Sequence, residues 1–371
     1  MKKLGLIVNP VAGMGGRVGL KGTDGAEILK KARQLGAKAE SPSRATETLK
    51  IISRIKDRIE MITYPGRMGE EACRKAGFLP TVIGAFEKDD TTADDTRAGA
   101  RRMMAAGVDL LLFAGGDGTA RDIYEIIGEN ATVLGIPAGV KMHSGVYAVT
   151  PKHAGLLSMS FLEGRLLDTR LAEVMDIDEE AFRQGIVSAK LFGYMRVPDN
   201  RTQIQSVKAG ASITVAESLK AIAAEVVAQM EADIFYLIGP GSTTRSVMEF
   251  LGLKNTLLGV DIVRNQKLVA NDVTEEVILK TTAGKKAKVV VTAIGGQGLV
   301  FGRGNQQISP RVLRQIGKGN IIIIATKEKL IALGGRPLLV DTGDEALNQD
   351  LRGYVRVTTG RGQYIMYKLD D

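Results

Sequence analysis

Short apolar runs alternate with helix-like stretches through the first 150 residues of the chain. The runs are continuous and rich in leucine or β-branched residues, and they fall at Leu4–Val8, Glu60–Tyr64, Thr81–Phe86, Val108–Phe113 and Thr132–Ile136. Continuous hydrophobicity of this length is typical of strands buried on both faces of a parallel sheet. Helical spacing between the runs predicts helices at Ala26–Leu35, Ala45–Arg58, Met68–Ala76 and Ala93–Ala106. The alternation of strands and helices predicts a doubly wound α/β domain over residues 1–150.

The pattern of apolar and polar residues changes after residue 150. Pro151 suits the first position of a helix over Lys152–Glu163. After Asp168, apolar and polar residues alternate, which predicts strands with one face more exposed to solvent. We therefore expect a second domain over residues 151–371, of mixed α/β class with β-rich segments. Its end alternates on both sides of Gly360–Gly362 and predicts a hairpin. A C-terminal segment that packs back on the first domain is left open.

Local signals mark several helix ends. Asp24 followed by Glu27 is a capping box for the first helix, and Gly36 suits its end. Asp272 followed by Glu275 predicts the cap of another helix.

Composition narrows the class of protein. The chain has 371 residues, a net charge of +8, 5% aromatic residues and no Trp. Stacking platforms for nucleic acid are therefore scarce, and small polyanions such as nucleoside triphosphates suit the mild basic excess. We expect no nucleic acid partner. No apolar run approaches the roughly 18 residues of a membrane span, so no membrane partner is expected. Cys73 is the single cysteine, which favours a cytoplasmic location.

The histidine content argues against a zinc site. His143 and His153 are the only histidines, and neither stands in a ligand spacing. A metal in this protein should be a hard ion that needs few protein ligands. Mg²⁺ held mainly by substrate phosphates fits, with no protein residue assigned as a ligand.

The first of three glycine-rich loops follows the strand at Leu4–Val8. Its sequence, "VNPVAGMGGRVGLKGTDG", delays the next helix by about fifteen residues, which is long for such a connection. The spacing of Gly13 and Gly15 fails the dinucleotide fingerprint, because the third glycine falls one place too far. We predict a loop whose amides and Arg17 approach phosphates, with an ordinary surface loop as the alternative.

The second loop, "GGDGT", places one carboxylate among three glycines. Gly115, Gly116 and Gly118 carry no Cβ, so backbone N–H groups can approach an anion, and a helix predicted from about Thr119 points its positive end there. An ionised Asp117 would repel phosphate unless it holds a metal or accepts a proton from an incoming hydroxyl. The alternative is that Asp117 only caps the helix.

"GGDGT" after an apolar strand, with "NPVAG" far upstream, resembles the NAD kinase and diacylglycerol kinase superfamily. Further stretches resemble the ATP-NAD kinase-like family that includes acetoin-catabolism X-type proteins: "GIPAGVKMHSGVYA", "IGPGSTTRSVMEFLG", "LLGVDIV" and "GGQGLVFGRGNQQISP". The resemblance runs from about residue 4 to about residue 330 and implies an NAD kinase-like α/β fold.

The resemblance also implies roles for individual residues. Asp117 would be the catalytic carboxylate that activates or orients the acceptor hydroxyl. The residues that would line the nucleotide phosphates are Gly115, Gly116, Gly118 and Thr119, with Asn9, Pro10 and Gly13 alongside. ATP and Mg²⁺ would be the cofactors.

Two departures from ordinary NAD kinases leave the acceptor open. The Asn-Glu pair that grips the dinucleotide in those enzymes is missing, and Asn271-Asp272 is only a look-alike. Their "GTLGFL"-type segment is replaced by Gly139–Ser144.

The third loop, Gly239–Arg245, again follows an apolar strand and opens a helix. Its candidate binding residues are Gly241, Ser242, Thr243 and Thr244. Hydroxyls and amides at a helix N-terminus suit an anion, and a capped helix start is the alternative. The segment Gly295–Gln307 adds Gln297, Arg303 and Asn305, which suit a ribose or phosphate or else an internal network. We expect both segments to face the Asp117 loop across the domain boundary.

Lys141 and His143 follow the strand that begins at Thr132. Ligands of doubly wound sheets gather at the carboxyl ends of strands, which predicts both side chains near Asp117. His153 is assigned a helix start and no chemistry.

These features favour a cytoplasmic kinase that transfers the γ-phosphoryl group of ATP, or of polyphosphate, to the 2′-hydroxyl of NAD. The alternatives are a lipid or other small-molecule hydroxyl kinase of the same superfamily, and a non-catalytic nucleotide-binding regulatory protein. We expect a homo-oligomer.

Overall fold

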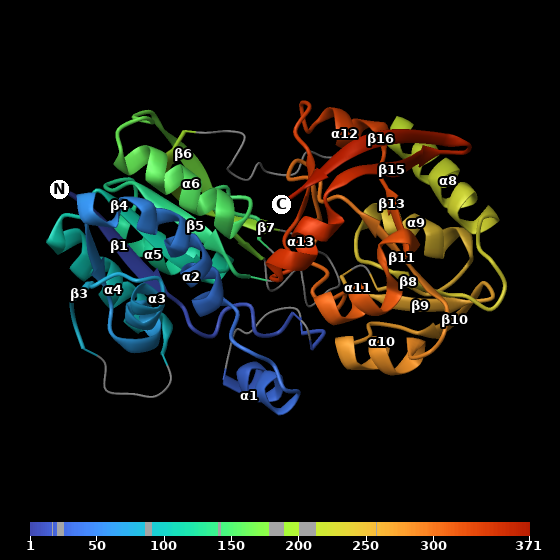
Figure 1. The fold of residues 1–371 in the computed structure, drawn as a ribbon, viewed down its shortest axis with the longest axis horizontal. Helices are drawn as coiled ribbons and strands as arrows, with labels where there is room; N and C mark the ends of the chain where they lie inside the picture. The colour runs from blue at the N-terminus through green and yellow to red at the C-terminus, as the bar shows by residue number, and fades with distance from the viewer. Residues whose placement is uncertain are drawn as a thin grey trace. The chain divides into compact units, whose positions relative to one another are not determined.

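The computed structural model describes residues 1–16, 18–20, 26–85, 91–139, 142–177, 189–199, 213–256 and 258–371. The chain divides into two compact units (Figure 1). The first comprises Met1–Met14 and Gly22–Val207, and the second comprises Gly15–Lys21 and Lys208–Asp371.

The first unit is built on a parallel sheet. Within its described residues five strands lie in the order β3-β2-β1-β4-β5, and every neighbouring pair is parallel. Their bounds are β1 Lys2–Val8, β2 Ile59–Thr63, β3 Thr81–Val82, β4 Leu110–Gly115 and β5 Val133–Pro137. All six residues of β4 are buried, as expected of a strand covered on both faces.

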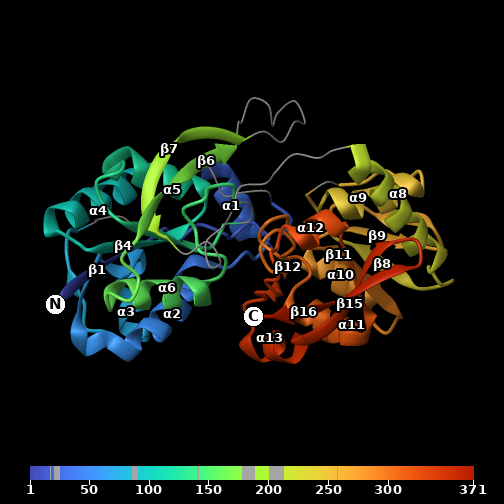
Figure 2. The ribbon, with the colours of Figure 1, turned by 90° about the horizontal axis from the view of Figure 1, so that it is seen from above.

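Helices cover both faces of this sheet. Figure 2 shows α2 (Ser41–Ile52), α3 (Glu70–Lys75) and α6 (Pro151–Leu162) on one face, with α4 (Ala93–Ala106) and α5 (Asp117–Ile127) on the other. The unit also holds α1 (Ala26–Gln34) and the 3₁₀ turns η1 (Ser53–Arg58) and η2 (Gly66–Met68). The doubly wound α/β architecture predicted for this part of the chain is confirmed.

Several local predictions shift by a few residues. Within the described residues, the strand predicted at Thr81–Phe86 covers Thr81–Val82, an exposed edge strand that Gly84 follows with φ +89°, and Phe86 lies outside the described residues. The helix predicted at Ala45–Arg58 begins at Ser41, with Pro42 in its first turn, and continues after Ile52 as the 3₁₀ turn η1. The helix predicted at Met68 begins at Glu70, because Gly69 has φ +146°. Gly36 ends α1 with φ +77°, as predicted, whereas the predicted cap Asp24 lies outside the described residues.

The first unit continues well beyond residue 150. The hairpin strands β6 (Thr169–Ile177) and β7 (Ala189–Pro198) pair antiparallel. Leu157 of α6, Val174 of β6 and Val197 of β7 are buried in the same hydrophobic core as the five-stranded sheet. Because these elements share that core, the compact unit ends at Val207, not near residue 150.

The second unit contains a mixed sheet. In the part of the unit that the structure describes, nine strands lie in the order β10-β9-β8-β11-β13-β15-β16-β14-β12. The bounds are β8 Phe235–Ile238, β9 Asp261–Arg264, β10 Lys267–Ala270, β11 Ala287–Thr292, β12 Leu299–Phe301, β13 Ile321–Ile324, β14 Leu338–Val340, β15 Gly353–Gly360 and β16 Gln363–Asp370. Strands β8, β11, β13 and β15 run parallel, and β15 with β16 forms the predicted antiparallel hairpin.

Helices cover both faces of the second sheet as well. They are α8 Ile213–Ala228, α9 Ser242–Phe250, α10 Glu275–Thr282, α11 Pro310–Ile316, α12 Lys327–Ile331 and α13 Glu345–Leu351, with the 3₁₀ turn η3 at Lys318–Asn320. Phe235 and Leu237 of β8 enter the core that α10 and α11 cover, whereas Tyr236 and Ile238 enter the core that α8 and α9 cover. The mixed α/β prediction for the second part of the chain is therefore confirmed.

The cap of α10 differs from the prediction. Thr274 caps this helix and accepts the backbone N–H of Val277. Asp272 stands two residues earlier with φ +48°, and its N–H donates to Asp261. Thr274 takes the cap because it is the residue that directly precedes the first helical residue, Glu275.

No described helix is long and apolar enough to span a membrane.

Cys73 lies in α3 and is fully buried. Burial raises the pKa of its thiol to about 12. The thiolate is the reactive form of cysteine, so it is scarce near neutral pH. We expect a thiol-disulfide reagent at pH 8 to leave the native protein unlabelled and to label one thiol per chain after unfolding in guanidinium. Fast labelling of the native protein would contradict the buried position.

Candidate functional site

Three loops meet at the carboxyl edge of the five-stranded sheet. They follow β1, β4 and β5, the adjacent strands at its centre and one edge. In a parallel α/β sheet this edge is where ligands bind.

The loop after β4 is short, because α5 begins at Asp117 and only Gly116 separates it from the strand. The helix thus starts two residues earlier than Thr119, where the sequence pattern placed it. A Cβ on Gly115 would lie 2.3 Å from the Thr119 hydroxyl oxygen, so glycine is needed there for packing. Gly116 and Gly118 are half-buried, which leaves their backbone reachable from solvent.

The loop after β1 is tied to this turn by Asn9. Its backbone N–H donates to Ala114 O at 2.9 Å, and its side-chain amide donates to the Thr119 hydroxyl at 3.0 Å. Its side-chain oxygen accepts the N–H of Val11 at 3.2 Å. Pro10, the next residue, is buried. Asn9 therefore fixes the start of its own loop against the start of α5.

Gly13 brings the loop after β1 against the loop after β5. It has φ +81°, and a Cβ there would lie 2.0 Å from Ala138 O. The N–H groups of Ala138 and Gly139 in turn both donate to Gly115 O at 3.1 Å. The Gly13 and Gly115 loops therefore share one sheet edge, with Ala138 between them. Arg17, predicted to approach phosphates, lies outside the described residues.

Asp117 does not cap its own helix. Gly116 is the N-cap of α5, and no side chain makes a cap hydrogen bond there. The Asp117 carboxylate instead accepts N–H groups from the loop after β5: His143 N donates to Oδ2 at 2.6 Å, and Ser144 N donates to Oδ1 at 3.1 Å. The alternative that Asp117 is only a helix cap is therefore wrong.

His143 makes a second contact with the same carboxylate. Its ring nitrogen Nδ1 lies 3.2 Å from Asp117 Oδ2. The Asp117 side chain is 4% exposed and the His143 side chain 19%. The prediction that His143 lies near Asp117 is confirmed, whereas Lys141 lies outside the described residues.

Ser144 and Tyr147 support this arrangement, although the sequence pattern gave them no role. The Ser144 hydroxyl donates to Met175 O at 2.7 Å and accepts Met175 N–H at 3.0 Å, which ties the loop to β6. Tyr147 donates to Gly116 O at 2.6 Å and packs edge-on against Phe113 of β4. The signal available in the sequence was their place just after His143 in "HSGVY".

The candidate residues on α9 lie in the second unit, and their exposure divides them. Gly241 is half-buried and Ser242 is exposed, whereas Thr243 and Thr244 are fully buried. Thr244 donates to Gly241 O at 2.9 Å, so its hydroxyl is used inside the helix start. Gly241 and Ser242 remain the reachable members of the set.

Lys329 of α12 contacts the start of α9, and the sequence pattern did not single it out. Its ammonium donates to the Thr243 and Thr292 hydroxyls, at 2.8 and 3.3 Å, and to Ala293 O at 3.3 Å. Lys329 follows the apolar strand β13, whose carboxyl end is the same kind of position that marked the other candidates. The lysine holds the ends of β8, β11 and β13 together.

Arg303 and Asn305 also lie in the second unit, and both are buried. Arg303 donates to Gln297, and Asn305 accepts Gly302 N–H at 3.0 Å and donates to Val300 O at 2.7 Å. This arrangement matches the internal-network alternative. A role for either residue toward a ligand stays a prediction, as does their placement toward Asp117.

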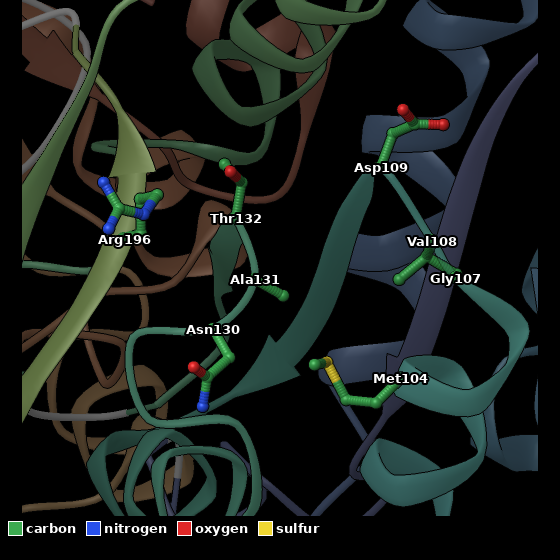
Figure 3. A pocket seen from close by; sticks show the side chains of 8 residues that line it. All are labelled: Met104, Gly107, Val108, Asp109, Asn130, Ala131, Thr132 and Arg196. Carbon is green, nitrogen blue, oxygen red and sulfur yellow. The ribbon is translucent and has the colours of Figure 1, made fainter.

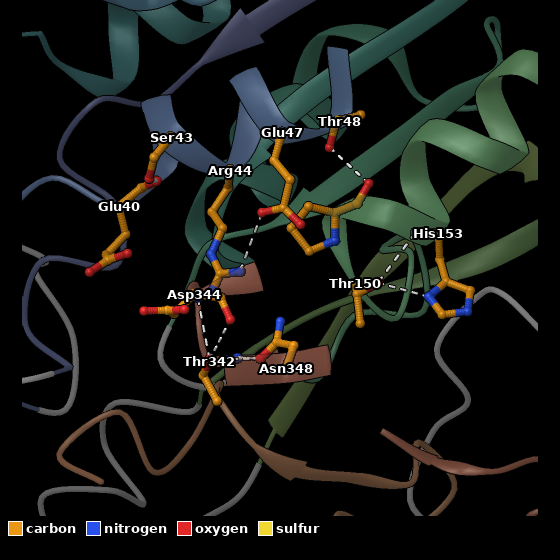
Figure 4. Close-up of polar contacts among 11 residues, drawn as sticks. Glu40, Ser43, Arg44, Glu47, Thr48, Thr150, His153, Thr342, Asp344 and Asn348 are labelled. Carbon is orange, nitrogen blue, oxygen red and sulfur yellow. Dashed lines mark hydrogen bonds and ion pairs between the residues drawn. The ribbon is translucent and has the colours of Figure 1, made fainter. Parts of the chain in front are cut away.

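Two other features of the first unit are a pocket and the second histidine. A pocket of about 350 Å³ (Figure 3) is lined by residues just before β4 and β5, including Asp109 and Thr132, and so lies at the opposite edge of the sheet. His153 belongs to the start of α6, where its backbone N–H and Nδ1 contact the Thr150 hydroxyl at 3.2 and 2.7 Å (Figure 4). His153 therefore has the structural role predicted for it.

No group of three or more His, Cys, Asp or Glu side chains suited to a metal occurs within the described residues. Apart from the single carboxylate of Asp117, the polar groups at the loop edge are mainly N–H groups and hydroxyls, which suit an anion. These residues fit a metal that arrives bound to phosphate better than one held by the protein.

A doubly wound sheet with glycine-bearing loops at its carboxyl edge, followed by a mixed α/β unit, is the architecture of an NAD kinase-like protein. The family model of the ATP-NAD kinase N-terminal domain matches residues 4–166, and that of the ATP-NAD kinase C-terminal domain matches residues 232–369. The chain belongs to the ATP-NAD kinase family and is a kinase. No curated protein matches it.

Proposed function

We propose that this kinase transfers the γ-phosphoryl group of ATP to the 2′-hydroxyl of NAD and so produces NADP. The observation that carries the proposal is the match of both ATP-NAD kinase domains, together with a glycine-lined carboxylate at the carboxyl edge of the first sheet.

The start of α5 suits the phosphates of the donor. Its N-cap is Gly116 and no side-chain cap occupies the helix end, so first-turn amides and the helix dipole are available to an anion. Gly116 and Gly118 present backbone without a Cβ, and Asn9 and Thr119 hold the neighbouring loop in place. We assign the phosphate contacts to these residues, with Pro10, Gly13 and Gly115 shaping the loops around them.

The charge of Asp117 does not exclude phosphate from this place. Its carboxylate oxygens accept N–H groups of His143 and Ser144, which offset the negative charge. Mg²⁺ bound to the donor phosphates would neutralise the charge that develops during transfer. Phosphoryl transfer also needs the acceptor hydroxyl held in line, and Asp117 is the carboxylate that we place at the reaction centre.

A second acceptor class is favoured by one observation. The look-alike of the missing Asn-Glu pair, Asn271-Asp272, is used for structure: Asn271 donates to Lys254 O at 3.1 Å, and Asp272 N–H donates to Asp261 at 2.9 Å. This favours another small hydroxyl-bearing acceptor as the runner-up to NAD. Polyphosphate as the donor, a homo-oligomeric state and a cytoplasmic location stay predictions.

A substrate panel tests the proposal. The purified protein is incubated with Mg²⁺ and either ATP or polyphosphate, with NAD, diacylglycerol or a set of small alcohols as acceptor, and products are identified by mass spectrometry. We expect NADP from ATP and NAD, and a rise of the unfolding midpoint with ATP, because a ligand that binds the native state stabilises it. Phosphorylation of another acceptor but not of NAD would move the assignment to that acceptor. Midpoint shifts without any product would leave only a nucleotide-binding protein.

A further inference from the structure

We infer that the acceptor hydroxyl gives its proton to Nε2 of His143, and that Asp117 acts as a positioning residue for that imidazole. The inference rests on the proposed phosphoryl transfer and adds the identity of the proton acceptor, a residue at which the chain departs from the ordinary NAD kinase segment.

The Asp117 carboxylate is already occupied by the protein. Oδ2 accepts the backbone N–H of His143 and contacts its ring, and Oδ1 accepts the N–H of Ser144. With its side chain only 4% exposed, little of the carboxylate is open to an incoming hydroxyl. A general base must come within hydrogen-bond reach of the proton that it removes. Asp117 is poorly placed for direct contact.

The same contacts set the tautomer of His143. An ionised carboxylate can only accept hydrogen bonds, so Nδ1, 3.2 Å from Asp117 Oδ2, must carry a proton. In a neutral imidazole the lone pair then lies on Nε2. Nε2 makes no hydrogen bond within the described part of the chain, and the ring is more exposed than the carboxylate behind it, 19% against 4%. The imidazole is therefore the more accessible base of the pair.

The remaining charges near this loop lie on β6 and α5. Glu173 of β6 is close to Gly145, since a Cβ on that glycine would lie 2.7 Å from Glu173 Oε2. Asp176 of β6 is paired with Arg121 of α5 at 2.9 Å. With Asp117, these charged groups of β6 and α5 lie near the loop that carries His143.

The step balances as a simple transfer. The oxygen of the acceptor hydroxyl forms a bond to the γ-phosphorus of ATP, and the bond between that phosphorus and the β–γ bridging oxygen breaks, with its electron pair leaving on ADP. The hydroxyl proton moves to Nε2 of His143, and Asp117 stabilises the imidazolium. The proton then passes to solvent. This division of labour is the general one for a histidine base oriented by a carboxylate.

The decisive experiment compares His143→Gln, His143→Ala and the control His153→Gln in the full-length protein. His153 is the other histidine of the chain, and it contacts the Thr150 hydroxyl at the start of α6. We expect kcat for the acceptor found in the panel to fall by about 10² to 10⁴ in both His143 variants and to stay within about twofold in the control. Free imidazole should partly restore the His143→Ala rate, which a structural role would not produce.

A pH profile gives a second readout. A base must be unprotonated to act, so kcat/KM falls as the pH drops, and an imidazole base loses activity at a higher pH than a carboxylate base does. Nitrogen-15 NMR of the two histidines, assigned with His153→Gln, should show protonated Nδ1 and bare Nε2 for His143 at pH 8, and Asp117→Asn should change that pattern.

The outcomes separate this inference from the proposed function. A wild type that turns over, with His143→Gln equally fast or a proton on Nε2, overturns the inference and leaves the kinase assignment intact. A wild type that phosphorylates none of the acceptors overturns the proposed function, and the role of His143 as a base with it.

Discussion

Replacing Asp117 by Asn should lower the turnover of phosphoryl transfer by about 10² to 10⁴ while the protein stays folded. The carboxylate offers two oxygens to two backbone donors, His143 N and Ser144 N. An amide offers one oxygen and one NH₂ group, so one of these N–H groups loses its acceptor and faces another donor. The substitution also removes the charge that stabilises an imidazolium on His143. Turnover falls because the imidazole of His143 loses both its orientation and the charge that stabilises its protonated form.

The stability cost of the same change should be modest. A buried N–H group left without a partner costs about 1 to 3 kcal/mol, which is a fraction of the stability of an ordinary domain. We therefore expect Asp117→Asn to unfold at a slightly lower urea concentration and to keep most of its affinity for ATP, since the helix start and the glycine backbone are unchanged. Urea denaturation measures the loss of stability, and calorimetric titration with ATP measures the affinity. Steady-state kinetics measure the turnover.

Asp122→Asn is the matched control. Asp122 lies on the same helix and is 6% exposed, close to the 5% of Asp117, but it pairs with Arg97 at 2.8 Å. If the loss of any buried carboxylate on α5 slowed the enzyme, both variants would be equally slow. A normal rate in Asp117→Asn, with wild-type turnover established, would remove Asp117 from the reaction centre.

The sequence predicted the parts of this structure that local patterns control. Continuous apolar runs marked the central strands because a strand covered on both faces has no polar side to show. Glycines after those runs marked the loops at the carboxyl edge. The short edge strand β3 was overestimated, since its apolar residues are not buried by a second neighbour.

Contacts between distant loops were beyond the reach of local patterns. The hydrogen bonds from His143 and Ser144 to Asp117 join positions 26 and 27 residues apart, through the packing of two loops. Lys329 reaches Thr243 across 86 residues in the same way. The assignment of α6, β6 and β7 to the first unit likewise depends on which core they share, which hydrophobic periodicity does not specify.

Gly13→Ala should disrupt the sheet edge at which the loops after β1, β4 and β5 meet. Gly36→Ala is the control that separates backbone strain from the steric clash. Both glycines are in the left-handed region, with φ +81° and +77°. Forcing alanine into that conformation costs about 1 to 2 kcal/mol at either position. The difference lies in the surroundings: no atom lies within 4 Å of a Cβ built on Gly36, whereas Ala138 O lies 2.0 Å from one built on Gly13.

The clash at Gly13 cannot be relieved by turning a side chain, because the contacted atom belongs to the backbone. Ala138 N–H is bonded to Gly115 O, so movement of Ala138 disturbs the end of β4 as well as the loop that carries His143. We expect Gly13→Ala to lose about 2 to 5 kcal/mol of unfolding free energy, from conformational strain and overpacking together. Its kcat/KM for ATP should fall at least about tenfold, because the phosphate-binding loops and the proton acceptor shift together. Gly36→Ala should lose only the strain cost and keep full activity. Urea denaturation and steady-state kinetics on the two variants measure these effects, and a Gly13→Ala protein as stable and as active as Gly36→Ala would show that the close approach of the two loops is dispensable.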